Sequence, residues 1–520
     1  MKILFVVADV YFSEPLGVML LSAISKEAGH QTKLAIIKRH HDLTSMLDGF
    51  QPDVVAYSTM TSDELLFSQA NDVVKAWSAS RNKPVTRIMG GPHPTYYPDV
   101  LHKLDLDAVC AGDGDRAIVS MVSAIADGRD MTGIPNVSTK QGRYTEKEVI
   151  EYLDDLPFFD RDMYYEAAPD MLQNGIRSLM SMRGCPYKCT YCFNHAFNRM
   201  FKGEGRKLLR RRSVDHVLAE LKEVKVKYPE MRIVRFADDV FVIQEDDWIR
   251  EFAERYPREI GVPFYCLVRA NSFTPAMAAL LRKAGCLSIC MSVEAGSAHV
   301  RNVVLKRNMS DETLISAFKS ARENGINIWG TTILGIPGTT LEDDFQSVAF
   351  ARKLRIAYPA FTIFAPFPGT ELTEHAIKLG LLQKDFDYQL TSLTSYSVLD
   401  CYTEKEKTIQ LNLFYLAPIF AMLPEFMFPV LRGLVRLRRL LPLYKFIGSM
   451  YTAALLGLRI FPGARPKGIA PLISALKVHF AYLTGKDILT KRIGLDFVGS
   501  KNRPISPETL PGSERTSVQG

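Results

Sequence analysis

The chain has 520 residues, 47% of them hydrophobic and 23% charged, with a formal net charge of +7 at pH 7. This length exceeds the size at which a single hydrophobic core keeps growing, so we expect two or three domains. The composition is ordinary for a folded protein and excludes an intrinsically disordered chain.

The N-terminus, MKILFVVADVYF, is a short apolar run that soon reaches Asp9. It lacks a small-residue cleavage site, so we interpret it as a buried strand and not as a signal peptide. Five cysteines are scattered along the chain: Cys110, Cys266, Cys286, Cys290 and Cys401. This is not the dense, even framework of a secreted disulfide protein, so we expect reduced thiols and a cytoplasmic location.

Residues 1–135 alternate short apolar runs with helical patterns. The expected strands are KILFVVA, KLAII, DVVAYSTM, VTRIMGG and DAVCAG. Their nearly continuous apolar character is typical of strands that are buried on both faces of a parallel sheet. Helical stretches such as GVMLLSAISKEAG lie between them. The pattern predicts an α/β, doubly wound, Rossmann-like domain over residues 1–135, followed by a linker over 136–175.

A second series of strands and helices is expected over residues 176–380. Its strands are RSLMSM, RIVRFADDVFV, FYCLVRAN, LSICMSVEAGS, INIWGTTILGIPG and PAFTIFAPFPGTEL. So many βα units are too many for a small open sheet, and they predict a partial or full βα barrel. In such barrels the chemistry lies on the loops that follow the strands, and the motifs described below fall at those positions.

The C-terminal region, 381–503, is expected to be helical, apolar and basic, with a disordered tail over 504–520. Residues 411–503 contain 14 Lys and Arg against 3 Asp and Glu. Prolines interrupt the apolar run 411–430, and a spanning helix needs about 20 apolar residues, so we do not expect a transmembrane segment. Two interpretations stay open: a helical cap packed on the barrel, and peripheral contact with an anionic membrane or a lipid-like substrate. We do not expect a nucleic-acid surface, because the segment lacks a stacking periodicity.

The stretch RGCPYKCTYCFNH gathers three cysteines, Cys185, Cys189 and Cys192, on a loop that leaves a strand. A structural zinc site needs four ligands, and His195 could be the fourth. Alternatively, three cysteines can hold a 4Fe–4S cluster in which one iron stays open for a substrate or cosubstrate. The residues by themselves leave both readings open, together with an incidental group of thiols.

The Cys-x3-Cys-x2-Cys spacing, with the aromatic Tyr191 before the last cysteine, resembles the radical SAM superfamily. The resemblance implies that the open iron chelates S-adenosylmethionine and that cleavage of this cosubstrate releases a 5'-deoxyadenosyl radical. The segment FADD (236–239) stands where the family has a Gly-Gly-Glu segment. Asp238 or Asp239 would then meet the methionine amino group, although a helix N-cap is the simpler reading of each.

Three further segments resemble motifs that bind S-adenosylmethionine in this family. In SVEAGS, Glu294 would contact the cosubstrate. In ILGIPG, Gly335 and Gly338 would let the backbone lie along the adenine. At the end of FYCLVRAN, Arg269 would meet the carboxylate or, equally well, form a structural ion pair. The segment PFPGTEL (366–372) resembles a late segment that closes the barrel in this family, and it is expected to be scaffold that could also contact the substrate.

The N-terminal domain lacks a Gly-x-Gly-x-x-Gly after its first strand, which argues against a dinucleotide site. Through EPLGVMLLSA, VVAYSTMT, MGGPHPT and AGDGDRA it instead resembles the cobalamin-binding domain of cobalamin-dependent radical SAM enzymes. The loops at Ser58, Thr59, Gly90 and Gly91 would approach the macrocycle, because small side chains leave the backbone exposed. The Asp-x-His-x-x-Gly motif is absent, so we expect His93 to be a loop residue and not a ligand of cobalt.

The resemblance covers residues 1–380 and implies a cobalamin-dependent radical SAM methyltransferase. The substrate would be an unactivated carbon of a hydrophobic compound or biosynthetic intermediate, methylated through a 5'-deoxyadenosyl radical and methylcobalamin. The alternatives are an oxidative cyclase or ring-rearranging enzyme, and a binding or sensor protein. The expected partners are a small-molecule or lipid-like substrate and a flavodoxin- or ferredoxin-like electron donor. The motifs assign no catalytic side chain.

Overall fold

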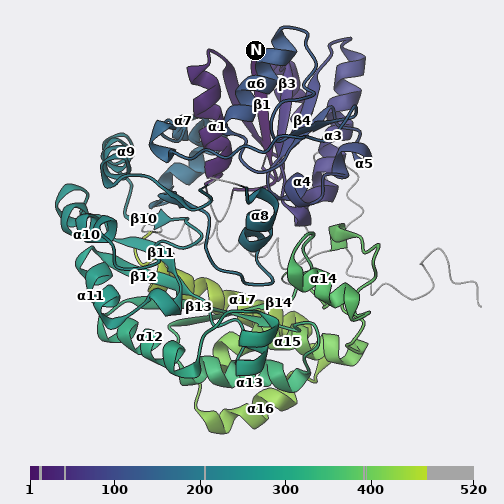
Figure 1. Ribbon diagram of the computed structural model, residues 1–520. Coiled ribbons are helices and arrows are strands. Elements are labelled where there is room, and N and C mark those ends of the chain that lie inside the picture. Colours follow the sequence, from purple (N-terminus) through teal and green to yellow (C-terminus); the bar gives the residue numbers. More distant parts are fainter. Residues whose placement is uncertain (11–13, 40–41, 204–206, 391–392, 394, 465–520) are drawn as a thin grey trace, which may run out of the picture.

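The computed structural model describes the whole chain except residues 11–13, 40–41, 204–206, 391–392, 394 and 465–520. Two six-stranded sheets, each flanked by helices, form an upper and a lower body (Figure 1). Helix α8 (Phe193–Phe201), which follows the cysteine loop, lies between these bodies. The α/β class and the two-sheet architecture expected from the sequence are therefore confirmed.

The N-terminal sheet has the strand order β2-β1-β3-β4-β5-β6, in which only β6 is antiparallel to its neighbour. Its strands are β1 (Lys2–Val7), β2 (Gln31–Ile36), β3 (Val54–Ser58), β4 (Thr86–Gly90), β5 (Ala108–Cys110) and β6 (Val137–Thr139). One face packs against α1 (Leu16–Glu27) and α6 (Asp115–Ala126), and the other against α2 (Leu43–Phe50), α3 (Glu64–Ser80) and α5 (Val100–Lys103). Phe5 points to the first face and Leu4 to the second, which explains the continuous apolar runs.

The segment 136–175, which we expected to be a linker, contains ordered elements. Strand β6 extends the N-terminal sheet, and helix α7 (Arg161–Ala167) packs against α1 and β2. Tyr164 of α7 is fully buried and belongs to a core that reaches both sheets. The segment therefore joins the two bodies by packing.

The second sheet has the order β14-β13-β12-β11-β10-β7, and every neighbouring pair is parallel. Its strands are β7 (Ile176–Leu179), β10 (Ile233–Phe236), β11 (Phe264–Val268), β12 (Cys286–Met291), β13 (Asn327–Leu334) and β14 (Tyr358–Ile363). The connecting helices are α9 (Val214–Lys227), α10 (Asp247–Glu259), α11 (Pro275–Lys283), α12 (Asp311–Glu323) and α13 (Leu341–Lys353). Among the described residues β7 and β14 do not pair, so the sheet is a partial barrel.

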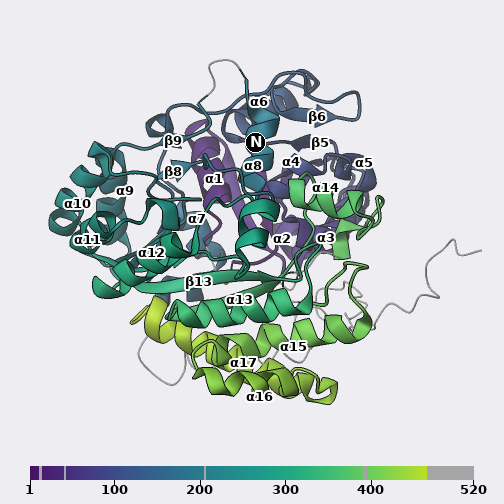
Figure 2. The ribbon, with the colours of Figure 1, turned by 60° about the horizontal axis from the view of Figure 1, so that its bottom comes forward.

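The C-terminal region forms a helical layer against the partial barrel (Figure 2). Its helices are α15 (Glu404–Phe420), α16 (Phe428–Leu434), α17 (Leu441–Leu455) and the single turn η9 (Leu456–Ile460). Helix α15 packs on β14 and α13, and α17 packs on α15. Beneath the barrel, the Ser288 hydroxyl donates to the Ile460 carbonyl at 2.6 Å and the Gly175 N–H donates to the Ala464 carbonyl at 2.8 Å.

The apolar run that begins at residue 411 is thus core, because Leu411, Leu413 and Leu416 of α15 are buried. The chain that follows closes the amino-terminal end of the barrel strands, as expected of a packed cap. No helix in the described part of the chain is both long and apolar enough to cross a membrane.

Candidate functional site

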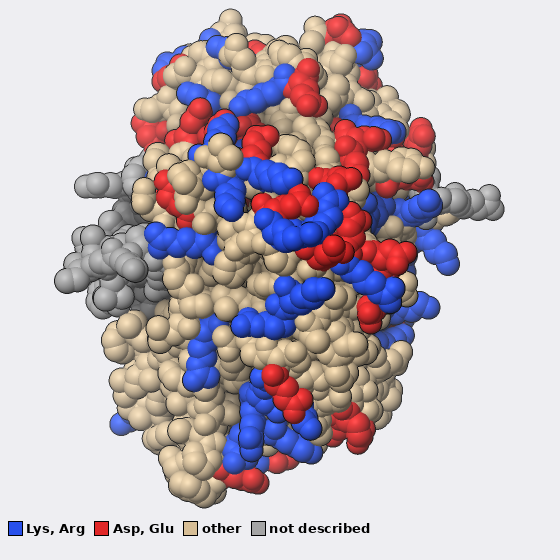
Figure 3. All heavy atoms as spheres, turned by 90° about the vertical axis from the view of Figure 1, so that its left-hand side faces the viewer, with Lys and Arg blue, Asp and Glu red and all other residues tan. Residues whose placement is uncertain are grey.

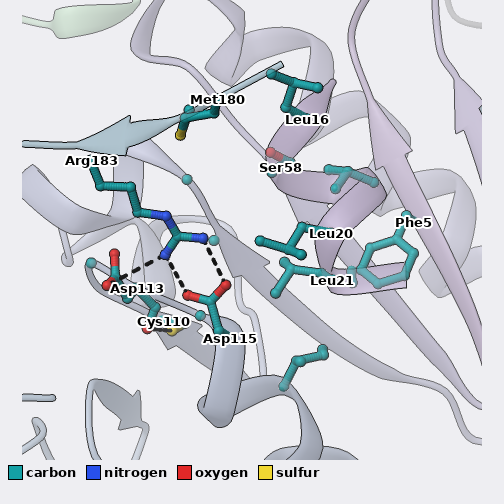
Figure 4. Close-up of a pocket in the computed structure, with 18 of the residues that line it drawn as sticks. Phe5, Leu16, Leu20, Leu21, Ser58, Cys110, Asp113, Asp115, Met180 and Arg183 are labelled. Atoms are coloured by element: carbon teal, nitrogen blue, oxygen red, sulfur yellow. Dashed lines mark hydrogen bonds and ion pairs between the residues drawn. The ribbon is translucent and has the colours of Figure 1, made fainter. Parts of the chain in front are cut away.

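A cavity of about 340 Å³ lies between the carboxyl ends of the N-terminal strands and the loop that carries the three cysteines. Figure 4 shows its two walls: α1 and the strand ends on one side, and the chain around Met180 and Arg183 on the other. The predicted residues that line it are Ser58, Gly90, Gly91 and Asp239. Much of the remaining wall is apolar and includes Leu16, Leu20 and Leu21 of α1. Residues expected from separate motifs therefore meet in one space.

Two glycines of this wall leave room that the protein itself does not fill. Gly17 and Gly90 both line the cavity, and a Cβ atom at either position would meet nothing within 4 Å. Packing therefore does not require glycine at these positions, whereas a bulky ligand pressed against the backbone would. This surface fits the flat macrocycle of cobalamin.

Thr59 and His93 lie behind this wall and do not line the cavity. Both are fully buried, and a Cβ at Gly91 would lie only 3.0 Å from the Thr59 backbone. The His93 ring packs in helix α4 (Pro92–Tyr96), with Nε2 at 3.2 Å from Glu64 and Nδ1 at 3.3 Å from the Thr61 hydroxyl. Burial would raise the pKa of Glu64, but hydrogen bonds from His93 and Lys103 outweigh it and lower the pKa to about 2. His93 is therefore engaged within its own domain.

Ion pairs across the cavity join the two bodies (Figure 4). The Arg183 guanidinium donates to both oxygens of Asp115, at 2.7 and 2.9 Å, and lies 3.5 Å from Asp113. Arg210 of strand β9 (Arg210–Arg211) pairs with Asp113 and donates to the Ile150 carbonyl at 2.8 Å. Burial would lower the pKa of Arg183, but the two carboxylates outweigh it and raise the pKa. The AGDGD loop thus binds the arginine that stands two residues before Cys185.

The cysteine loop runs from strand β8 (Met182–Arg183) to α8, with Cys192 as the N-cap residue of that helix. Gly184 has φ +90°, and a Cβ there would lie 2.2 Å from the Leu208 carbonyl oxygen, so this turn requires glycine. Burial raises the pKa of the Cys185 thiol to about 12 and that of Cys192 to about 11. Thiolates at these positions therefore need a positively charged centre, as the irons of a cluster would provide.

The zinc alternative does not fit this arrangement. Within the described chain, no three His, Cys, Asp or Glu side chains converge closely enough to hold a single metal ion. His195, the fourth ligand considered, has Nε2 at 3.2 Å from a Glu371 oxygen. Three separated thiols on one loop suit the corners of a larger iron–sulfur cluster.

Arg269, expected near the carboxylate of the cosubstrate, lies against the cluster loop. Its Nη1 donates to the Cys189 sulfur at 3.1 Å, and its guanidinium stacks 4.0 Å from the centroid of the Tyr187 ring. Its Nη2 donates to the Arg307 carbonyl. This cation stabilises a negative charge on the cysteine sulfur.

The two aspartates of the FADD segment have different surroundings. Asp238 is fully buried and accepts from the Ser181 N–H and hydroxyl, each at 2.6 Å, and from the Met182 N–H at 2.8 Å. Burial raises its pKa to about 6 despite these hydrogen bonds. Asp239 faces the cavity, whose walls raise its pKa while hydrogen bonds with Asn194 and Gly184 oppose the rise. Neither residue caps a helix, and only Asp239 has a carboxylate open to the cavity.

Tyr191 and Glu294 meet at the barrel strand ends and share a partner that the sequence did not reveal. The Tyr191 hydroxyl donates to Glu294 at 3.0 Å, and Arg307 donates to the same hydroxyl and lies 3.7 Å from Glu294. Glu294 has φ +65°, so its backbone is strained in a way that usually marks a constrained site. Arg307 is a single basic residue outside every motif, so no pattern in the sequence points to it.

The glycine segment after β13 is held by the C-terminal region. Gly335 has φ +66°, and its N–H donates to Asp344 at 2.8 Å. The Gln410 amide of α15 donates to the other Asp344 oxygen at 3.0 Å. Gly338 also has a positive φ, of +82°. Neither Gly335 nor Gly338 lines the cavity, so their expected contact with adenine stays a prediction.

Two family models match the chain. The B12 binding domain matches residues 3–122, and the Radical SAM superfamily matches residues 179–351. An uncharacterized methyltransferase of Pyrococcus horikoshii is 29% identical over 384 residues, which are 71% of this chain and 79% of that protein. The anaerobic magnesium-protoporphyrin IX monomethyl ester cyclase of Rubrivivax gelatinosus is 22% identical over 396 residues, with 72% and 68% covered.

The fold has a counterpart among solved structures. The radical S-adenosylmethionine methyltransferase TsrM from Kitasatospora setae, with cobalamin and a 4Fe–4S cluster bound, aligns with a TM-score of 0.63 at 15% identity. The alignment covers 88% of this chain and 100% of that one. The two matched domains account for the cavity wall and the cysteine loop. The chain therefore contains a B12 binding domain followed by a radical SAM domain, and these domains imply a 4Fe–4S cluster, S-adenosylmethionine and cobalamin as its cofactors.

Proposed function

We propose that this protein transfers a methyl group to an unactivated carbon. One observation carries the proposal: a single cavity is lined by the strand-end loops of the B12-binding domain and by Gly184 and Asp239 beside the cysteines. A methyl carrier on one wall and a radical generator on the other would act on the same substrate. A relative named as a methyltransferase supports this reading.

When bound, the cluster supplies the electron that cleaves S-adenosylmethionine, and cobalamin carries the methyl group. Cys185, Cys189 and Cys192 would hold the cluster, and Arg269 would offset the negative charge on Cys189. Asp239 would accept a hydrogen bond from the amino group of the cosubstrate. The leucines of α1 keep that wall of the cavity apolar and so help to exclude water, which protects a radical from side reactions.

The second candidate is an oxidative cyclisation without methyl transfer, because one relative is named as a cyclase. This reaction would use the same cavity and cosubstrate as methyl transfer, so only the reaction products can distinguish the two functions. We also propose a small-molecule substrate and a one-electron donor of the flavodoxin or ferredoxin kind. Membrane contact is a separate proposal, since it depends on the outer surface of the C-terminal helices and not on the cavity.

The test uses anaerobically reconstituted full-length protein with cobalamin, S-adenosylmethionine and dithionite. We expect release of both 5'-deoxyadenosine and S-adenosylhomocysteine, and a substrate product heavier by one CH2 group. 5'-Deoxyadenosine without S-adenosylhomocysteine would reject methyl transfer and favour cyclisation.

Replacing Cys185, Cys189 and Cys192 together by Ala should remove the iron and abolish 5'-deoxyadenosine formation. The matched control is Cys286→Ala, because Cys286 begins strand β12 and so lies at the end of the barrel strands opposite to the cysteine loop. Iron and cleavage that persist in the triple variant would defeat the cluster assignment.

A further inference from the structure

Large apolar side chains gather on the outer surface of the last described helices. Single exposed apolar residues are normal, but here six lie along residues 426–447, a stretch that includes the short turns η7 (Glu425–Met427) and η8 (Arg438–Leu440), helix α16 and the first half of α17. We call this set the outer apolar face: Phe426 (76% exposed), Val430 (45%), Leu437 (48%), Leu443 (49%), Phe446 (49%) and Ile447 (40%).

The helices that carry this face are fixed from their other side. Leu431, Val435 and Tyr444 are buried, and the Tyr444 hydroxyl donates to the Leu434 carbonyl at 2.9 Å, which joins α17 to α16. Helix α16 also packs on α15. The outer apolar face therefore belongs to a layer of helices whose inner side is packed on the rest of the protein.

All charged residues of the segment that carries this face are basic. Residues 426–464 contain six Lys and Arg and no Asp or Glu. Arg436, Arg438 and Arg439 are exposed, and no carboxylate in the described part of the chain pairs with them. Figure 3 shows acidic and basic side chains interspersed over the upper part of one face; lower down, uncharged areas surround a smaller group of basic and acidic side chains. Cations beside exposed aromatic and aliphatic side chains are the composition of an interfacial membrane surface.

We propose that the outer apolar face docks on the surface of an anionic lipid bilayer. Phe426, Phe446 and their aliphatic neighbours would enter the headgroup region, and the exposed arginines would lie at the lipid phosphates. Helices α16 and α17, which carry most of this face, lie beyond the second sheet from α8 (Figure 2), so docking would leave the cavity between the bodies accessible.

Charge favours lipid over the other occupants of such a face. A second copy of the chain in a two-fold dimer would bring the same arginines together, and like charges repel. The chain that follows, residues 465–503, has eight Lys and Arg against two acidic residues, so it would also be repelled by this face. It would instead add to the attraction toward an anionic bilayer.

The test is co-sedimentation of the full-length protein with phosphatidylcholine vesicles, with and without phosphatidylglycerol. We expect binding only when phosphatidylglycerol is present, and release by high salt. One arginine near an anionic surface contributes about 1 kcal/mol, which is roughly five-fold. Arg436→Glu/Arg438→Glu/Arg439→Glu should therefore weaken binding on the order of 100-fold or more. Phe446→Ser/Ile447→Ser leaves the charges unchanged and should also weaken vesicle binding, because it removes apolar side chains from the face.

Matched controls come from other surfaces. Val226→Ser replaces an apolar side chain that is 85% exposed on α9, and Arg129→Glu/Arg250→Glu/Arg258→Glu reverses three arginines outside this face. Both controls should bind vesicles as the wild type does, and every variant should keep the circular dichroism spectrum of a folded chain.

Three outcomes would overturn the proposal. One is equal binding to neutral and anionic vesicles, or no binding to either. Another is a dimer in sedimentation velocity that Phe446→Ser/Ile447→Ser dissociates, which would assign the face to a second copy. A third is tighter binding to a DNA oligonucleotide than to vesicles, lost in the arginine variant.

Discussion

Asp238 and Asp239 are neighbours in sequence, but the structure gives them separate tasks. Asp238 accepts three hydrogen bonds from Ser181 and Met182, so it holds the turn between β7 and β8. Asp238→Asn would place an amide NH2 against donors, and we expect a loss of about 3 kcal/mol in the free energy of unfolding. Asp239→Asn should leave stability unchanged but weaken binding of S-adenosylmethionine about ten-fold, through the lost charge-assisted hydrogen bond.

The two effects are measured by urea unfolding and by equilibrium dialysis with S-adenosylmethionine on cluster-loaded protein. If Asp238→Asn kept the wild-type free energy of unfolding, the hydrogen bonds that Asp238 accepts would be dispensable for stability. Unchanged affinity in Asp239→Asn would remove this residue from the cosubstrate site.

The sequence locates the side chains of this site better than it assigns their contacts. The cysteine spacing identifies the loop because three ligands are close in sequence. Arg269, the partner of Cys189, stands 80 positions away, and no local pattern distinguishes a contact with the cosubstrate from a structural contact. Arg183 and Arg307 carry no motif at all, since an ion pair formed by folding leaves no local pattern.

At the scale of elements, strand prediction succeeded for the apolar parallel strands. All five strands expected in the N-terminal domain and all six in the barrel are present, because most of them are apolar runs that are buried on both faces. Strand β13 differs, since its residues alternate between buried and half-buried. Strands β6, β8 and β9 escaped prediction. They have three, two and two residues, too few for any periodicity, and they are fixed by long-range pairing.

The contact between α13 and α15 makes stability depend on pH. Asp344 is buried, and burial raises its pKa to about 7 from about 3.9 in an unfolded chain. Ionisation of this carboxyl therefore costs more free energy in the folded than in the unfolded state. This difference, which destabilises the folded state, is absent below about pH 4 and complete above about pH 7, where it is on the order of 4 kcal/mol. The free energy of unfolding should fall as pH rises through this window.

Asp344→Asn should remove much of this fall and stabilise the protein at pH 8. The Asn oxygen would still accept from Gly335, and its NH2 could donate to the Gln410 oxygen, which is buried and lacks a hydrogen-bond partner among the described residues. Urea unfolding between pH 4 and pH 8 measures the effect. Glu342→Gln, on the exposed side of α13, serves as control and should keep the wild-type slope of unfolding free energy against pH. The same slope in Asp344→Asn would show that Asp344 does not cause the pH dependence.

At the scale of the whole molecule, several buried contacts make the two bodies one unit. Glu14 of the N-terminal domain accepts from the Ser178 N–H of β7 and, at 2.9 Å, from the Tyr165 hydroxyl of α7. The Tyr96 hydroxyl donates to the Phe193 carbonyl of α8 at 2.9 Å. The cavity therefore lies across an interface that is already closed by packing, and its geometry depends on that interface.

The Arg183–Asp115 pair tests this dependence, because it is the bidentate contact across the cavity. Removing one partner leaves the other charge buried, so Asp115→Asn and Arg183→Gln should each cost about 3 kcal/mol in unfolding free energy. The double variant should cost clearly less than the sum, with a coupling of about 1 to 3 kcal/mol. The control is Arg116→Gln, an exposed neighbour paired with Glu148, whose loss should cost under about 1 kcal/mol. Strictly additive losses of unfolding free energy would mean that this ion pair does not help to hold the two bodies together. In that case the wild type, the two single variants and the double variant should retain bound cobalamin equally well.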